Sequence, residues 1–146
     1  MRIHIFIISA ASFFLLFSRN IEIKSGHISL QGKQTSGNML YAKYCMTCHQ
    51  ADGKGVRGMF PPLAGNAKIT GPSADLIKIV LFGLQGPITV NERDYNQPMP
   101  AQGYLKDAQI ADILNYIRNS WENKAPPITP GDVGKIRKLG KPKKTN

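Results

Sequence analysis

Both cysteines of this chain and one of its histidines lie within five positions. Cys45 and Cys48 are separated by two residues, and His49 follows directly; the 146-residue chain has no other cysteine and three histidines in all. Side chains at i and i+3 lie on the same side of a helical turn. The pattern therefore predicts a site in which two sulfur atoms and one imidazole act together.

The spacing C-x-x-C-H is the attachment signature of c-type haem. Two thiols on one turn can add to the two vinyl groups along one edge of the porphyrin, and the next histidine can reach the iron with Nε2. Such attachment holds the cofactor in a small domain with a limited core. We expect Cys45 and Cys48 to form thioethers to one haem c, with His49 as an axial iron ligand.

Three other uses of the motif fit the sequence less well. A thiol–disulfide oxidoreductase also uses C-x-x-C, but no strand pattern of a βαβ unit precedes Tyr44. A zinc site normally needs four ligands, and the remaining candidate, His27, lies in a stretch without periodicity. A bare disulfide at this spacing would close a very small loop and stabilise the fold little.

The second axial position of the iron could be filled by a methionine or by His27. Met46 lies inside the attachment loop, Met39 lies on the preceding helix, and Met59 follows the motif by only ten residues. Met99 lies 50 residues beyond the histidine, between two prolines, in a stiff segment that can reach the far face. Because His and Met are the usual axial pair in c-type electron carriers, we expect Met99 to be the second ligand.

The elements that must position these residues are mostly helical. The stretch "SGNMLYAKYCMTCH" predicts a helix with Ser36 as N-cap that ends at the cysteines. Residues 50–72 are rich in glycine and proline and predict a long loop. Ser73 is the expected cap of a second helix that stops at Gly83, and residues 88–95 predict a small hairpin.

The strongest periodicity lies in "LKDAQIADILNYIRNSW". Its apolar residues recur at i, i+3, i+4, i+7 and i+11, on one helical face: Ile110, Ile113, Leu114, Ile117 and Trp121. Further on, Thr129 as N-cap, Pro130 at N1 and Asp132 at N3 predict a short helix. The loops are too long for a self-sufficient bundle. The predicted fold class is all-α, with three main helices and long loops wrapped around one covalently attached haem.

The N-terminal segment has the features of an export signal. Arg2 precedes an apolar run over residues 3–17, but no small-x-small cleavage pattern follows it. An uncleaved anchor is therefore the alternative, although a membrane span needs about 20 residues. We expect residues 1–20 to be a signal peptide or anchor and residues 21–35 a linker, in a protein that is periplasmic or tethered to the outer face of the inner membrane.

The net charge of +10 is concentrated near the C-terminus. Residues 36–121 hold 8 Lys and Arg against 6 Asp and Glu, whereas residues 122–146 hold 7 against 2. A basic tail can contact acidic proteins, lipid headgroups or nucleic acid, and an exported chain does not meet nucleic acid. We expect residues 122–146 to form a basic extension that contacts a redox partner or a membrane surface; a solvated, disordered end is the alternative.

From residue 37 to residue 121 the chain resembles a class I cytochrome c, a single-haem electron carrier. Gly37, Tyr41 and Cys45 have the family's glycine–aromatic–cysteine spacing. The resemblance implies that the N- and C-terminal helices of a domain spanning residues 36–121 cross closely. Ile113 and Tyr116 would supply the C-terminal half of that crossing.

Two loops carry the rest of the resemblance. "FPPLAGN" resembles the family's PPLxG loop, which implies that the Pro61 carbonyl, or failing that the Pro62 carbonyl, accepts the Nδ1–H of the ligating histidine. "MPAQG" resembles the methionine-ligand loop. Two positions depart from the family pattern. Lys106 replaces a Ser or Thr cap, so Asp107 is the alternative cap, and Glu92 replaces a turn glycine, which disfavours a tight primed turn.

Taken together, these features predict a one-electron carrier without enzyme activity of its own. Two strong axial ligands leave no open iron position, and apolar residues such as Leu63, Ile79 and Phe82 are expected to line a dry pocket. The expected partners are redox proteins such as a periplasmic dehydrogenase or a terminal oxidase. The alternatives are a haem subunit fixed in such a complex and a haem sensor or peroxidase with a labile sixth ligand.

Overall fold

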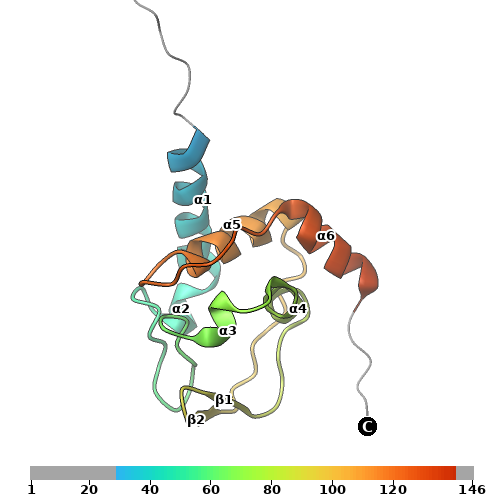
Figure 1. Ribbon diagram of the computed structural model, residues 1–146. Coiled ribbons are helices and arrows are strands. Elements are labelled where there is room, and N and C mark those ends of the chain that lie inside the picture. The colour runs from blue at the N-terminus through green and yellow to red at the C-terminus, as the bar shows by residue number, and fades with distance from the viewer. Residues whose placement is uncertain (1–28, 141–146) are drawn as a thin grey trace, which may run out of the picture.

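The computed structural model describes the backbone of residues 29–140 and the side chains of residues 36–140. The predicted leader and most of the predicted linker lie outside the described residues, so these domain boundaries stay predictions. The elements are, in chain order, α1 (Ser29–Tyr44), α2 (Met46–His49), α3 (Ala67–Thr70), α4 (Ser73–Phe82), β1 (Ile88–Val90), β2 (Arg93–Tyr95), α5 (Asp107–Arg118) and α6 (Pro130–Leu139). The arrangement is predominantly helical (Figure 1), as predicted.

The first helix begins earlier than predicted. α1 starts at Ser29, so the prediction of Ser36 as its N-cap is wrong, and the helix runs into the segment expected to be a linker. Residues 29–35 have no apolar face, which hides them from a periodicity argument, but most are adequate helix formers. The Ser36 hydroxyl instead donates to Asp112 Oδ2 of α5, at 3.3 Å.

The crossing of α1 and α5 is the most extensive contact between helices among the described residues (Figure 1). Gly37 makes it possible, because a Cβ at this position would clash with the Asp112 carbonyl oxygen and would lie 2.9 Å from Tyr116 Cβ. The rings of Tyr41 and Tyr116 pack beside it with centroids 5.3 Å apart. Tyr41 and Ile113 are both buried. The predicted helix crossing is thus present.

α4 and the hairpin follow as predicted, with one correction. α4 begins at Ser73, but the capping position is Pro72 and no side chain caps the helix, so the predicted Ser73 cap is wrong. Gly83 ends α4 at φ 75°, a conformation that favours glycine. In the hairpin, β1 pairs antiparallel with β2. Asn91 and Glu92 both have positive φ, so a tight primed turn forms despite Glu92.

α5 carries the predicted buried face, with Ile110, Ile113, Leu114 and Ile117 in the core. Its capping position is Lys106, whose backbone N–H donates to Gln109 Oε1 at 3.0 Å. Asp107 is therefore the first helical residue and not the cap. Its carboxylate instead accepts a hydrogen bond from Arg137 of α6.

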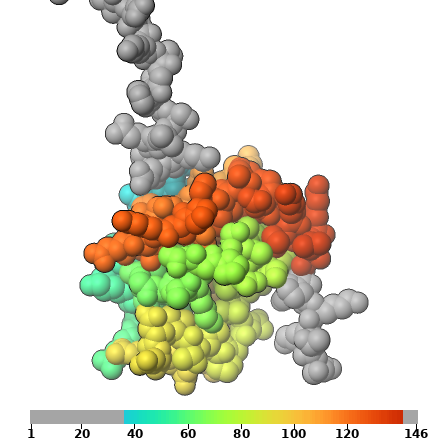
Figure 2. Space-filling view, in the orientation of Figure 1, coloured from blue at the N-terminus to red at the C-terminus, as the bar shows by residue number. Residues whose placement is uncertain are grey.

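α6 packs against the first part of α5 and against α4. Its start has the predicted reciprocal cap, because Asp132 N–H donates to Thr129 Oγ1 and Thr129 N–H donates to Asp132 Oδ2, with Pro130 at N1. Val133 is completely buried. In the space-filling view the C-terminal segment from residue 122 lies directly on the segment that holds α3 and α4 (Figure 2). None of the helices within residues 29–140 is long and apolar enough to cross a membrane.

Candidate haem site

The cysteines and the histidine share one turn between α1 and α2. Cys45 N–H donates to the Tyr41 carbonyl at 2.8 Å, and the N–H groups of Cys48 and His49 both donate to the Cys45 carbonyl, at 3.2 and 3.0 Å. The three side chains line the same cavity, and neither cysteine is in a disulfide. Burial, and secondarily the charge of Cys48, raises the pKa of Cys45 to about 11. The unmodified thiol is therefore protonated near neutral pH.

The imidazole of His49 is held by a loop residue. Its Nδ1 lies 3.1 Å from the Pro61 carbonyl oxygen. The Pro62 carbonyl is used differently, since it accepts a hydrogen bond from Asn66 Nδ2 at 2.9 Å. A carbonyl can only accept, so Nδ1 carries the proton and Nε2 is left with its lone pair. Burial lowers the pKa of His49, and the bond to Pro61 opposes that shift, so a neutral imidazole is favoured.

The loop that carries Pro61 is folded tightly over the motif. Gly55 N–H donates to the His49 carbonyl at 3.0 Å, and Val56 and Phe60 form an isolated β-bridge. Gly55 has φ of 64°, and a Cβ there would meet the Phe60 and Pro61 carbonyl groups. The glycine-rich sequence of this loop is therefore needed for the close approach that brings the Pro61 oxygen to the histidine.

Met99 lines the same cavity as the motif. Its backbone forms two hydrogen bonds with Leu84, at 2.9 and 3.0 Å, beyond the end of α4. Gly83 allows this pairing of Met99 with Leu84, because a Cβ at position 83 would lie only 2.6 Å from the Met99 carbonyl oxygen. Met39, Met46 and Met59 are exposed and do not line the cavity, and His27 lies outside the described residues. Among the described methionines, only Met99 lines this cavity.

The cavity wall is mainly apolar. Leu63 and Ile79 line it as predicted, but Phe82 does not and instead packs against the core. The reason is helical spacing: Leu76, Ile79 and Val80 form one stripe of α4 facing the cavity, and Phe82 falls beyond its edge. The sequence argument also missed wall residues from the hairpin, α5 and the loops: Ile88, Val90, Tyr95, Asn66, Gln97, Gln102, Leu114 and Ile117.

The burial of Arg118 was also not predicted from the sequence. Arg118 is not among the apolar residues that define the predicted face of α5, yet it is 3% exposed. Its guanidinium donates to the carbonyls of Ile69, Gly71 and Pro126 at 2.8, 2.9 and 3.3 Å. Burial lowers its pKa, and these three carbonyls compensate for the lost hydration. Because Ile69 lines the cavity, Arg118 supports the wall from behind.

The chemistry of this donor set fits a covalently attached haem. Two thiols on one turn, an imidazole with a free Nε2, a thioether and an apolar wall share one cavity. Within residues 29–140 no three side chains of His, Cys, Asp or Glu are grouped so as to hold a metal ion by themselves.

Comparisons with known proteins agree with this geometry. The family model described as Cytochrome c matches residues 34–121. Cytochrome c-552 of Thermus thermophilus is 41% identical over 113 residues, which cover 71% of this chain and 86% of that protein. The cytochrome c subunit of alcohol dehydrogenase (quinone) from Gluconobacter oxydans (strain 621H) is 38% identical over 117 residues, and the cytochrome c subunit of gluconate 2-dehydrogenase from Pantoea cypripedii is 37% identical over 113 residues.

The chain spans only 24% of the length of each of these two dehydrogenase subunits, but most of the length of cytochrome c-552. The family match covers more than half of the chain and contains the motif, the Pro61 loop, the Met99 segment and α5. The chain therefore belongs to the cytochrome c family: it is a class I c-type cytochrome of all-α fold that carries covalently bound haem c and transfers electrons.

Proposed function

We propose that Cys45 and Cys48 form the thioether bonds to the haem, that His49 Nε2 and the Met99 thioether are its axial ligands, and that the Pro61 carbonyl orients His49. The haem supplies one-electron chemistry, with its iron cycling between the ferrous and ferric states. The observation that carries this proposal is that all four side chains line one cavity, with His49 Nδ1 already engaged by Pro61.

The surrounding residues tune and protect this centre. The Pro61 hydrogen bond fixes the tautomer and orientation of His49 and raises its basicity as a ligand. A thioether ligand raises the reduction potential, and the apolar wall disfavours the more highly charged ferric state further. With His49 and Met99 as the two iron ligands, the haem would have no iron position left for a substrate. This supports electron transfer without an enzyme activity of its own.

The partner is proposed from the relatives. Several of them are named as cytochrome subunits of dehydrogenases: of alcohol dehydrogenase (quinone), of gluconate 2-dehydrogenase and of fructose dehydrogenase. We infer that this chain passes electrons between exported or membrane redox partners, a dehydrogenase among them, on the outer side of the inner membrane. A free carrier is favoured over a fixed subunit because the chain covers most of cytochrome c-552. Stable co-purification with a dehydrogenase subunit would favour the fixed arrangement.

The test is the visible spectrum of the protein matured in an exporting host, reduced, with and without carbon monoxide. A c-type spectrum that the gas leaves unchanged is expected, because both axial positions are filled. A spectrum shifted by the gas would contradict the Met99 assignment and favour a sensor or peroxidase with a labile sixth ligand.

A further inference from the structure

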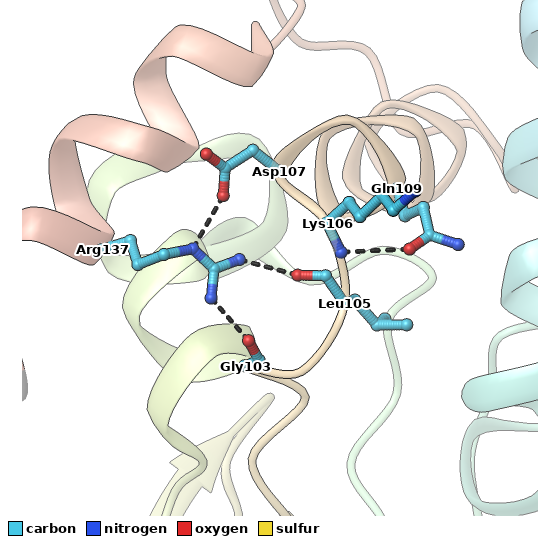
Figure 3. Close-up of polar contacts among 6 residues, drawn as sticks. All are labelled: Gly103, Leu105, Lys106, Asp107, Gln109 and Arg137. Atoms are coloured by element: carbon cyan, nitrogen blue, oxygen red, sulfur yellow. Dashed lines mark hydrogen bonds and ion pairs between the residues drawn. The ribbon is translucent and has the colours of Figure 1, made fainter.

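Arg137, on α6, contacts the segment that follows Met99. Its Nε donates to Asp107 Oδ1 at 2.8 Å, and its two terminal nitrogens donate to the carbonyls of Gly103 and Leu105 at 2.5 and 2.7 Å. Figure 3 shows the guanidinium reaching from α6 across to this segment and to the first residue of α5. One side chain of the C-terminal extension therefore binds three groups within five residues.

The same segment is held from its other side by α4. Gln102 N–H donates to the Val80 carbonyl at 2.8 Å, and the backbone of Met99 is paired with Leu84. A Cβ on Gly103 would lie 2.8 Å from the Leu81 carbonyl oxygen, so the segment is in close contact with α4 at this point. Residues 102–105, which begin three positions after Met99, thus lie between α4 and the guanidinium of Arg137.

α6 is shaped for this contact. Gly134 lies one turn before Arg137, and a Cβ there would lie 3.0 Å from Asp107 Oδ2. Its absence lets α6 approach the start of α5. The buried Val133 anchors the helix in the core. The close approach of α6 to α5 therefore depends on Gly134 and Val133 as well as on the Arg137–Asp107 ion pair.

We propose that Arg137 is a positioning residue for the methionine ligand: by binding the Gly103 and Leu105 carbonyls, it keeps the Met99 segment closed over the iron. This inference rests on the proposed assignment of Met99 as ligand. α6 lies beyond the residues that the family model matches, so the extension acts as a clamp on the sixth ligand. Breaking the clamp makes the thioether easier to displace.

The strength of the clamp comes from its geometry more than from its charge. Arg137 and Asp107 side chains are each 34% exposed, and partly exposed ion pairs contribute little. The fork of the guanidinium, however, can reach two carbonyls and one carboxylate at once, which an ammonium group cannot reproduce. Arg137→Lys is therefore expected to lose most of the hold on the Met99 segment, even though the substitution keeps the positive charge.

The experiment uses the ferric, haem-loaded full chain and measures imidazole affinity together with the weak long-wavelength band of sulfur-ligated ferric haem. Arg137→Gln is expected to raise imidazole affinity at least tenfold, about 1.4 kcal/mol, and to lose the sulfur band at a lower temperature. Arg137→Lys is expected to move in the same direction, and it carries the test if the glutamine variant does not yield holoprotein.

Two control variants separate positioning from general stability. Lys138→Gln changes the same charge on an exposed residue of the same helix. Asn123→Ala removes bonds to Gly65, Leu63 and Ile117 and lowers stability without touching the Met99 segment. Both are expected to keep wild-type imidazole affinity. If the wild type shows the sulfur band but Arg137→Gln and Lys138→Gln bind imidazole equally well, the clamp is overturned. A wild type without that band would overturn the Met99 assignment, and the clamp with it.

Discussion

At the scale of single residues, the site depends on which atom of each side chain is left free. His49 has one ring nitrogen bound to the Pro61 carbonyl at 3.1 Å, so only Nε2 can reach an iron. Met99 has its backbone paired with Leu84 while its side chain lines the cavity. Which side chains can act as ligands thus depends on backbone contacts as well as on residue type. The two proposed ligands are held differently: a hydrogen bond to the ring orients His49, whereas the Met99 side chain is positioned through the hydrogen bonds of its backbone.

Replacing Met99 tests this scale directly. In Met99→Ala the protein should keep its covalent haem, because the cysteines are untouched. The ferrous iron should then bind carbon monoxide stoichiometrically, and the reduction potential should fall, because the thioether that favours ferrous iron is gone. Gas titration and redox potentiometry measure these changes. Met59→Ala is the matched control, since Met59 is 46% exposed and does not line the cavity. Unaltered gas binding in Met99→Ala would contradict the assignment.

At the scale of elements, glycines decide how closely segments approach. Gly37 lets α1 cross α5, Gly83 makes room for the Met99 segment, and Gly134 lets α6 approach Asp107. Helix-level patterns were largely sufficient to predict α4, α5 and α6, because each has a strong apolar face or cap. The beginning of α1 was mispredicted because residues 29–35 have neither. The predicted caps at Ser36 and Ser73 were also wrong. An N-cap residue has non-helical backbone angles, whereas Ser36 lies inside α1 and Ser73 is the first helical residue of α4.

The helix crossing gives a second prediction. Gly37→Ala should destabilise the folded state by roughly 1–3 kcal/mol, as overpacking of a closed contact does. The added Cβ would press on the Asp112 carbonyl and on Tyr116, and both belong to a buried helix pair. Thermal unfolding followed by the haem absorbance measures the loss. Gly131→Ala is the control, because a Cβ there has only Thr129 Oγ1 nearby at 3.5 Å and should stabilise α6 by up to about 1 kcal/mol. Equal stability of Gly37→Ala and wild type would contradict the close crossing.

The cap of α6 has a predictable pH dependence. Hydrogen bonds from the Thr129 side chain and backbone hold the pKa of Asp132 below its ordinary value of 3.8. A carboxylate with a lowered pKa stabilises the folded state fully above that ordinary value and loses the effect as the pH falls through its folded pKa. Protection of α6 amides in hydrogen exchange should therefore decrease below about pH 4. In Asp132→Asn this decrease should be absent and protection should already be lower at neutral pH; the same acid-dependent decrease in that variant would exclude the cap as its cause.

At the scale of the whole molecule, charge is segregated from the haem domain. The C-terminal extension packs on the domain through α6 (Figure 2), while Lys135 and Lys138 of the same helix are exposed. Further lysines follow in the sequence at positions 141, 143 and 144. A cationic region of this kind attracts acidic partners or anionic membranes over about 10 Å at 0.1 M salt. The extension thus has two separable contributions, since Arg137 faces inward whereas Lys135 and Lys138 are exposed.

Truncation after residue 140 removes Lys141, Lys143 and Lys144 but keeps α6 and Arg137, so it reduces the cationic charge without removing the Arg137 contacts. Reduction of the trianion ferricyanide at low salt should slow by a few-fold to roughly tenfold in the truncated protein, and the difference should vanish at high salt. Stopped-flow spectroscopy measures both rates. A cationic cobalt oxidant is the control and should not be slowed. Equal rates for full-length and truncated protein with ferricyanide at low salt would contradict steering by the tail.

The sequence by itself determined the features whose information is local. The periodicity of α5, the Gly83 stop and the Thr129 cap are local features, and the structure has all three as predicted. The C-x-x-C-H motif is local too, and the family that it indicates is confirmed. The meaning of these patterns does not change with the rest of the chain, because each pattern lies within a single helix or at one helix end.

Only the tertiary structure decided the contacts between distant segments. It distinguished Pro61 from Pro62 at His49, removed Phe82 from the cavity wall and buried Arg118 against three carbonyls. It also brought Arg137 to Gly103, 34 positions away in the chain. No local pattern encodes such pairings, because a carbonyl is present at every residue, and which one a side chain reaches depends on how the helices pack.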